Sequence, residues 1–167
     1  MRATLAAVLL ALLASARLCA AQHPRVGAPA PDFVLVDLHG DSARLSQFRG
    51  HAVVLKFWAS WCPTCRTEMP ELLAARDAHR DVGLVVLTVD SDERPSHISR
   101  YLAKIPGVED LPVLLDGNRR VQDLYRIMLL PTTMFIDSAG IVRGIHAGAL
   151  EADSLVAGLR DVLEPHS

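Results

Sequence analysis

Two cysteines separated by two residues, Cys62 and Cys65, stand directly behind a run of apolar residues. Thiols at this spacing can close into a small disulfide ring and reopen, so the pair can carry two electrons to or from another protein. Cys62 falls where a strand would pass into a helix, and the free N–H groups and the dipole at a helix N-terminus favour negative charge. We therefore expect its thiol pKa within about 3.5 to 7.5, the range of such positions.

The two sulfurs are expected to act one after the other. Cys62 is predicted to attack, since its thiolate is available at neutral pH. Cys65, one turn inside the predicted helix and shielded, would resolve the mixed disulfide by attacking the sulfur of Cys62 and releasing the partner.

Other uses of a closely spaced cysteine pair fit less well. A structural bridge over so short a loop would remove little entropy from the unfolded chain. A zinc site takes about four ligands and would need a second pair of this kind, which the chain lacks. Attachment of a c-type haem requires His after the second cysteine, and Arg66 occupies that place. We predict neither a metal nor a cofactor.

The N-terminal residues have the pattern of a secretory leader. A positively charged start is followed by the uncharged apolar stretch 4–16 and by small residues that end at Ala21. The stretch is short for a membrane span, which takes about 20 apolar residues. We predict that residues 1–21 are a signal peptide and that the protein works in the periplasm or extracytoplasmic space. An uncleaved leader that anchors the protein to the membrane is the alternative.

Residues 22–167 are expected to form a single domain, since about 145 residues can bury a proper core. Only one closely spaced cysteine pair remains after cleavage, so the chain is not a disulfide-framed mini-domain. The 17 basic and 19 acidic side chains form no basic block. We therefore predict no nucleic-acid partner. We expect a monomer.

Strand and helix patterns alternate along this domain. Two short strands joined by a turn predict an N-terminal hairpin, and two almost wholly apolar runs are typical of central parallel strands covered on both faces. The order of the elements is a βαβ unit followed by a ββα unit, which predicts an α/β fold with a mixed sheet. The predicted strands are 33–36, 43–45, 52–58, 82–89, 113–115, 132–136 and 141–146, and the predicted helices are 64–79, 95–104, 119–125 and 151–163.

Residues 57–70, with the sequence FWASWCPTCRTEMP, resemble the active-site region of the exported TlpA/ResA/CcmG branch of thioredoxin-like proteins. Segments 28–33, 130–137 and 141–148 agree with the same branch, so the resemblance covers nearly the whole predicted domain in the expected order. It implies a thioredoxin fold, a central mixed β-sheet flanked by helices, with an N-terminal β-hairpin extension.

The resemblance also implies a role for Glu68, because a glutamate at this place lies close to the dithiol and handles its protons. On a helix Glu68 lies one turn beyond Cys65 on the same side, so it could act as a general base toward that thiol. The alternative is a solvated carboxylate on the helix surface. Lys56 stands where cytoplasmic thioredoxins carry a buried Asp. It could extend its charge outward along the strand or lower a nearby thiol pKa, and both roles stay open.

Pro131 resembles the cis-proline that faces the dithiol in thioredoxin-like folds. It would turn the backbone of Leu130 toward the disulfide and offer an edge to an extended client segment. Trp58 is expected in the core and Trp61 at the surface beside the cysteines. The predicted client-binding residues are Trp61, Pro63, Thr64, Leu130 and Pro131.

The resemblance implies an exported thiol:disulfide oxidoreductase that reduces or exchanges disulfides of client proteins. Implied clients are apocytochrome c before haem attachment and proteins with copper-site cysteines, and the implied electron donor is a membrane thiol protein. The direction of electron flow does not follow from the motif, since proteins with the same motif span about 150 mV in reduction potential.

Two other classes of protein stay open. A peroxiredoxin shares the opening 30–33, but its peroxidatic cysteine requires Thr or Ser three residues before it, where Ala59 stands. A copper-binding assembly factor without redox turnover would use Cys62 and Cys65 with a distant His or Met. Such carriers usually space their cysteines more widely.

Overall fold

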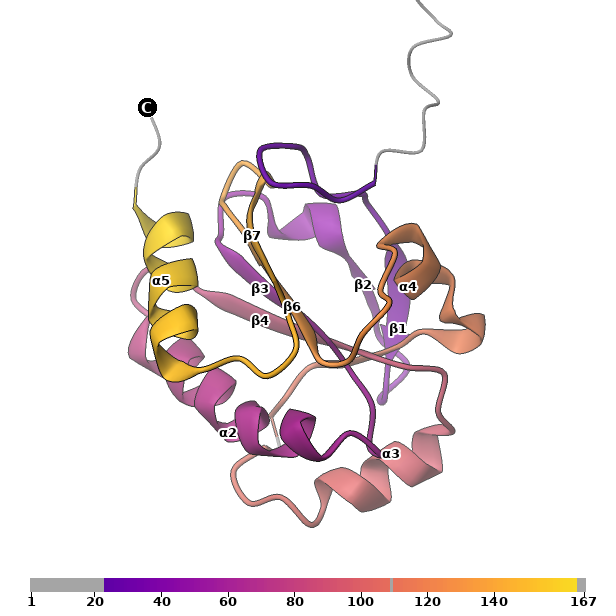
Figure 1. Ribbon diagram of the computed structural model, residues 1–167. Coiled ribbons are helices and arrows are strands. Elements are labelled where there is room, and N and C mark those ends of the chain that lie inside the picture. The colour runs from indigo at the N-terminus through magenta and orange to yellow at the C-terminus, as the bar shows by residue number, and fades with distance from the viewer. Residues whose placement is uncertain (1–22, 109, 165–167) are drawn as a thin grey trace, which may run out of the picture.

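The computed structural model describes residues 23–108 and 110–164 of the 167-residue chain. The predicted leader and its cleavage site lie outside the described residues. Within them, one mixed sheet of seven strands has the order β2-β1-β5-β4-β3-β6-β7 (Figure 1). The strands are β1 (Val34–Asp37), β2 (Ser42–Arg44), β3 (Val53–Trp58), β4 (Val85–Asp90), β5 (Val113–Leu115), β6 (Thr132–Ile136) and β7 (Val142–Ala147).

The sheet has the topology that the sequence predicts. β3 runs parallel to β4 and antiparallel to β6, and β6 pairs antiparallel with β7. β1 and β2 form the predicted antiparallel hairpin at the N-terminal end of the domain. The α-helices are α2 (Pro63–Ala78), α3 (Pro95–Leu102), α4 (Arg120–Leu124) and α5 (Ala152–Leu163), and Leu45–Phe48 and Gly117–Arg119 are 3₁₀ turns.

Apolar side chains fill both faces of the sheet. One core layer packs α2, α3 and α5 against the sheet and includes Leu72, Ile98 and Leu159. The other lies under the N-terminal segment and α4 and includes Phe33 and Tyr125. Every residue of β3 is buried, as expected of a strand covered on both faces.

Element boundaries differ from the prediction where the backbone turns. The predicted strand 82–89 begins only at Val85, because Gly83 has a φ of 71° and ends a turn. The predicted helix 119–125 begins only at Arg120, because Arg119 has a φ of 55°, which an α-helix does not tolerate.

The site lies where the central strands β3 and β4 end at their carboxyl termini. Parallel strands β3 and β4 end there side by side, with Trp58 opposite Asp90. The chain then passes from β3 through a short turn into α2, which carries both cysteines. The carboxyl ends of neighbouring parallel strands and a helix N-terminus therefore meet at the cysteines.

Candidate active site

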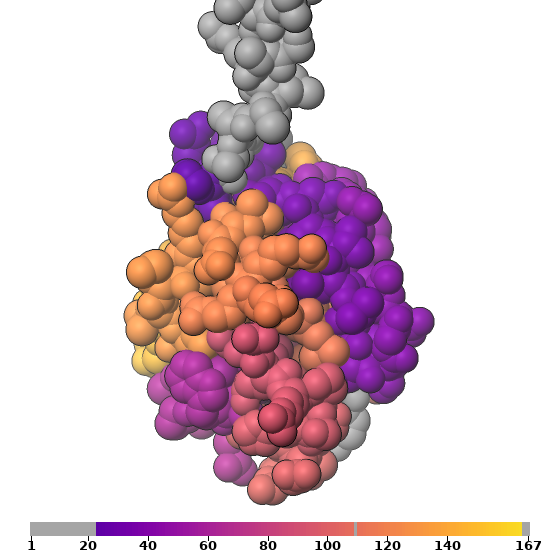
Figure 2. Space-filling view, turned by 90° about the vertical axis from the view of Figure 1, so that its right-hand side faces the viewer, coloured from indigo at the N-terminus to yellow at the C-terminus, as the bar shows by residue number. Residues whose placement is uncertain are grey.

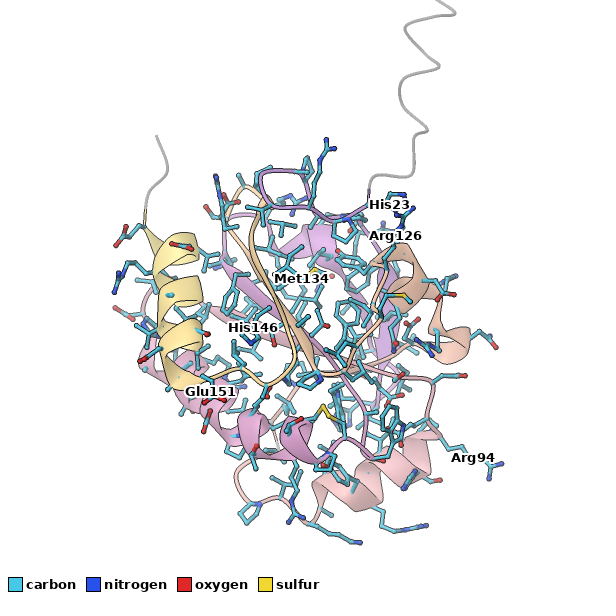
Figure 3. All side chains as sticks on the ribbon, in the orientation of Figure 1. His23, Arg94, Arg126, Met134, His146 and Glu151 are labelled. Atoms are coloured by element: carbon cyan, nitrogen blue, oxygen red, sulfur yellow. A yellow bond between two sulfur atoms is a disulfide. The ribbon has the colours of Figure 1, made fainter. Side chains whose placement is uncertain are left out.

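Cys62 and Cys65 form a disulfide in the first turn of α2 (Figure 3). Cys62 is the N-cap residue, and its Sγ accepts a hydrogen bond from the N–H of Cys65 at 3.3 Å. Pro63 takes the first helical position, where its missing N–H costs nothing. Cys65 has no exposed surface and Cys62 is 4 % exposed. The shielding of Cys65 is confirmed, whereas the roles of the two sulfurs in exchange stay predictions.

The turn before the helix presents Trp61 to solvent. The N–H of Cys62 donates to the carbonyl of Ala59 at 3.1 Å, which closes a turn over residues 59–62. Trp61 is 66 % exposed, while Trp58 is fully buried and stacks on Tyr101. The expected placement of both tryptophans is confirmed.

The loop before β6 lies on the same apolar cluster as the cysteines. The peptide bond between Leu130 and Pro131 is cis, as the resemblance implies. Leu130 is half-buried and packs against the core layer that contains Cys62 and Cys65. Met128, two residues earlier, is 93 % exposed. In the space-filling view of Figure 2, the orange part of the chain borders the pink part that contains α3 on the face turned to the viewer.

Glu68 is buried, so its interpretation as a solvated carboxylate on the helix surface is wrong. Its Oε2 accepts a hydrogen bond from Nζ of Lys56, and its Oε1 accepts one from the N–H of Leu150 at 3.0 Å. The carboxylate therefore joins α2 to β3 and to the loop between β7 and α5.

Lys56 has no exposed surface, so it does not extend its charge outward along the strand. The reason is its place in β3: alternate side chains of that strand point toward α2, and Glu68 meets the ammonium there. Burial lowers the pKa of Lys56, while the hydrogen bond and charge of Glu68 and the charge of Glu71 act in the opposite direction. Whether this charge lowers a thiol pKa stays an open prediction.

Two further carboxyl groups lie beside the turn 59–62, and the sequence analysis missed both. Glu93 accepts hydrogen bonds from the N–H and the hydroxyl of Ser60. The N–H of Glu93 donates to Oδ2 of Asp90 at 2.8 Å. Desolvation, reinforced by the neighbouring Glu93 side chain, raises the pKa of Asp90 to about 7. One local feature of the sequence could have indicated them. Asp90 and Glu93 follow the apolar run 82–89, which was predicted to be a parallel strand, and functional polar groups gather at the carboxyl ends of such strands.

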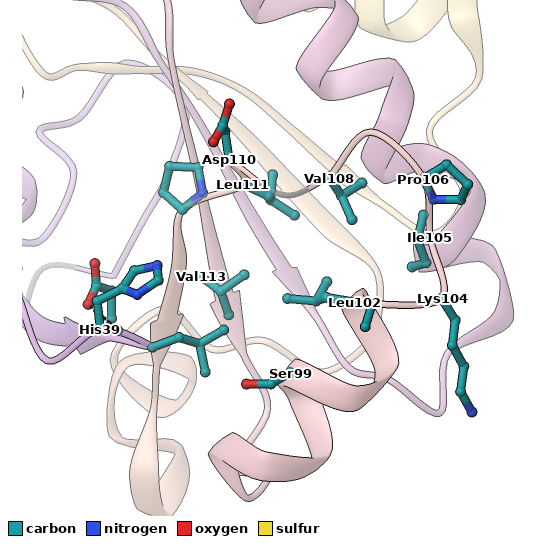
Figure 4. Close-up of a pocket in the computed structure, with 14 residues that line it drawn as sticks. His39, Ser99, Leu102, Lys104, Ile105, Pro106, Val108, Asp110, Leu111 and Val113 are labelled. Atoms are coloured by element: carbon teal, nitrogen blue, oxygen red, sulfur yellow. Dashed lines mark hydrogen bonds between the residues drawn. The ribbon is translucent and has the colours of Figure 1, made fainter.

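The main cavity of the described structure lies away from the dithiol. A cavity of about 840 Å³ lies between the β1–β2 turn and the loop after α3, and its lining includes His39, Leu102 and Ile105 but neither cysteine (Figure 4). In the described part of the chain, no cluster of three or more His, Cys, Asp or Glu side chains is arranged to hold a metal ion. The described helices are all too short or too polar to span a bilayer.

Comparison with known proteins agrees with this geometry. The model of the AhpC/TSA family matches residues 26–145. The chain is 34 % identical over 137 residues to the thiol-disulfide oxidoreductase ResA of Geobacillus kaustophilus, covering 82 % of this chain and 78 % of the relative. It is 32 % identical over 139 residues to ResA of Bacillus subtilis, covering 83 % and 76 %.

A solved structure shows the same fold. The crystal structure of a thiol:disulfide interchange protein, DsbE, from Chlorobium tepidum aligns with a TM-score of 0.77 and 31 % identity, over 84 % of this chain and 99 % of that one. Proteins of this kind act on cysteines of other proteins. The chain thus belongs to the AhpC/TSA family and is a thioredoxin-fold thiol-disulfide oxidoreductase of the ResA type.

Proposed function

We propose that the protein is exported and reduces disulfides of client proteins through Cys62 and Cys65. The observation that carries the proposal is the position of the pair: both cysteines lie at the start of α2, next to an exposed Trp61, and belong to the apolar cluster against which Leu130 packs. An exposed aromatic side chain beside the reacting pair suits contact with a polypeptide client, because aromatic residues are enriched where proteins bind one another.

The proposed exchange moves two electrons in two steps. The Cys62 thiolate attacks one sulfur of the client disulfide, which breaks that bond, forms a mixed disulfide and releases one client thiolate. Cys65 then loses its proton and attacks Sγ of Cys62. The Cys62–Cys65 disulfide forms, the mixed disulfide breaks and the second client thiolate leaves and takes up a proton. A membrane thiol protein would return the two electrons to the oxidised pair.

Glu68 is proposed to accept the proton of Cys65. Each of its oxygens already accepts one hydrogen bond, from Lys56 and from Leu150. A carboxylate has about four lone-pair sites, so capacity for a further proton remains. The neighbouring Lys56 ammonium would hold the carboxylate in place during the transfer.

The proposed clients have two cysteines close together, as in apocytochrome c before haem attachment or in a copper-site protein. The similarity to ResA and DsbE proteins and the leader-like N-terminus support this assignment and the extracytoplasmic location. Trp61, Pro63, Thr64, Leu130 and Pro131 are proposed to contact the client.

The reduction potential of the Cys62–Cys65 pair tests the direction of electron flow. The protein without residues 1–21 is equilibrated in glutathione and dithiothreitol redox buffers, and the fraction oxidised is read by trapping free thiols. We expect a value near that of thioredoxin, about −270 mV, or lower. A value near about −120 mV would instead identify an oxidant, and the proposal of a reductant would fall.

A peroxidase is the second candidate, favoured by the match to the AhpC/TSA family model and the opening 30–33 that peroxiredoxins share. Ala59 offers no hydroxyl three residues before Cys62, so we expect no peroxide consumption above that of free thiols. Measuring loss of hydrogen peroxide with the reduced protein and with its Cys62→Ser variant separates the two functions.

A further inference from the structure

Glu93 lies 33 positions from Ser60 in the sequence but binds it directly. The N–H of Ser60 donates to Oε2 of Glu93 at 2.6 Å, and the Ser60 hydroxyl donates to Oε1. The Glu93 side chain is only 8 % exposed. A buried carboxylate is costly unless its oxygens accept hydrogen bonds, so these two contacts decide where Glu93 can lie.

The surroundings of Glu93 hold it in this position. Its own N–H donates to Oδ2 of Asp90 at the end of β4, and its Oε1 lies 3.3 Å from Nδ1 of His97 in α3. Arg94, the next residue, projects away from the domain into solvent (Figure 3). Glu93 is thus the residue of this loop that turns inward, toward the turn 59–62.

We infer that this Ser60–Glu93 link positions Trp61 for contact with the client, a role that rests on the proposed function. Ser60 is the second residue of the turn 59–62 and Trp61 is the third. Fixing the backbone at Ser60 therefore restricts the direction of the Cα–Cβ bond of Trp61, which limits where the indole ring can reach.

Trp61 depends on the link more than Cys62 does. Cys62 is held separately, by its N–H bond to Ala59, by its N-cap position and by Pro63 behind it. The Trp61 side chain makes no hydrogen bond or ring contact with the described part of the chain and is 66 % exposed. Because the link already holds the backbone that carries the indole, client binding has only the side-chain torsions of Trp61 left to order, so the link speeds recognition without altering the sulfur chemistry.

Single-turnover exchange tests the inference. The reduced protein is mixed with a synthetic peptide that contains an oxidised Cys-x-x-Cys pair, and separately with glutathione disulfide, a small substrate that the indole does not need to recognise. The fluorescence of the two tryptophans follows oxidation of the dithiol. For Glu93→Gln and for the milder Ser60→Ala, we expect the rate with the peptide to fall about tenfold and the rate with glutathione disulfide to change less than twofold.

A double-mutant comparison shows whether the effect passes through Trp61. In a Trp61→Ala background, which leaves Trp58 as the reporter, adding Glu93→Gln should change the peptide rate less than twofold. Asp32→Asn is a matched control, since Asp32 accepts the N–H and hydroxyl of Ser46 in the same way, both at 2.9 Å. This control should leave both rates unchanged. Denaturation curves of each variant confirm that it is folded.

Three results would overturn the inference. They are an unchanged peptide rate in both Glu93→Gln and Ser60→Ala, an equal loss with peptide and glutathione disulfide, and a tenfold loss that persists without Trp61. If the wild-type protein itself fails to reduce the peptide while it reacts with glutathione disulfide, the proposed function fails instead.

Discussion

Replacing Glu68 by Gln (E68Q) would leave the Lys56 ammonium without its carboxylate at a place that has no exposed surface. Removing one partner of a buried ion pair costs about 3–5 kcal/mol. Lys56 can avoid part of this cost by losing its proton. From an ordinary lysine pKa of about 10.4, deprotonation at pH 7 spans about 3.4 units at about 1.36 kcal/mol each, so about 4.6 kcal/mol is the upper limit. We expect a loss of about 3–4.5 kcal/mol in the free energy of unfolding at pH 7.

The pH dependence distinguishes this cause from a general packing defect. A neutral Lys56 in the folded variant binds fewer protons than the same lysine in the unfolded chain. The free energy of unfolding of E68Q should therefore rise with pH, and the difference from wild type should shrink by about 1.4 kcal/mol per pH unit between pH 7 and 8.5. Urea denaturation of the oxidised proteins at several pH values measures this slope.

Two controls accompany the measurement. Glu71 is exposed and lies about one turn further along α2. The Glu71→Gln variant should therefore change the free energy of unfolding by less than about 0.5 kcal/mol. Adding Lys56→Met to E68Q removes the unpaired charge and should recover at least half of the loss, because apolar replacements of buried ion pairs are often tolerated. A loss under about 1 kcal/mol, or one that does not change with pH, would refute the buried-pair reasoning.

Three further outcomes follow from the structure. Cys65→Ser should accumulate a mixed disulfide between Cys62 and a client peptide, since the resolving sulfur is absent, and mass spectrometry would detect the adduct; failure to form it would contradict the order of attack. Asp90→Asn should gain stability over wild type by about 1–3 kcal/mol between pH 4.5 and 7.5, because a carboxyl pKa raised to about 7 means that wild type loses stability as pH rises through this window. A flat difference across that window, measured by denaturation, would argue against a buried charge at Asp90. Gly158→Ala should cost about 1–3 kcal/mol, since a Cβ there would lie 2.4 Å from the Phe135 ring, and Phe135→Leu in the same chain should relieve part of the loss.

The parts of the site that follow from local sequence were predicted well. A strand-to-helix junction with Cys62 at the helix start needs only nearby residues, and the cis bond before Pro131 came from the resemblance. Lys56 was harder, because an apolar strand covered on both faces leaves a charged side chain no direction toward solvent. Its position makes sense only with Glu68, which lies 12 residues away on a helix. Glu93 reaches Ser60 across a still longer separation, and no local pattern marks that contact.

The contacts of Glu68 also connect the cysteine helix to the proposed client-binding loop. The N–H of Leu150 donates to Oε1 of Glu68. Gly148, two residues before Leu150, donates its N–H to the carbonyl of Pro131 at 2.8 Å. One short loop is thus bonded to α2 at one end and to the cis-proline at the other. Removing both side-chain oxygens of Glu68 would disturb the proposed proton transfer at Cys65 and the position of Pro131 together. The variant that combines Lys56→Met with E68Q separates these effects, since Gln still offers an oxygen to Leu150 but accepts no proton from a thiol.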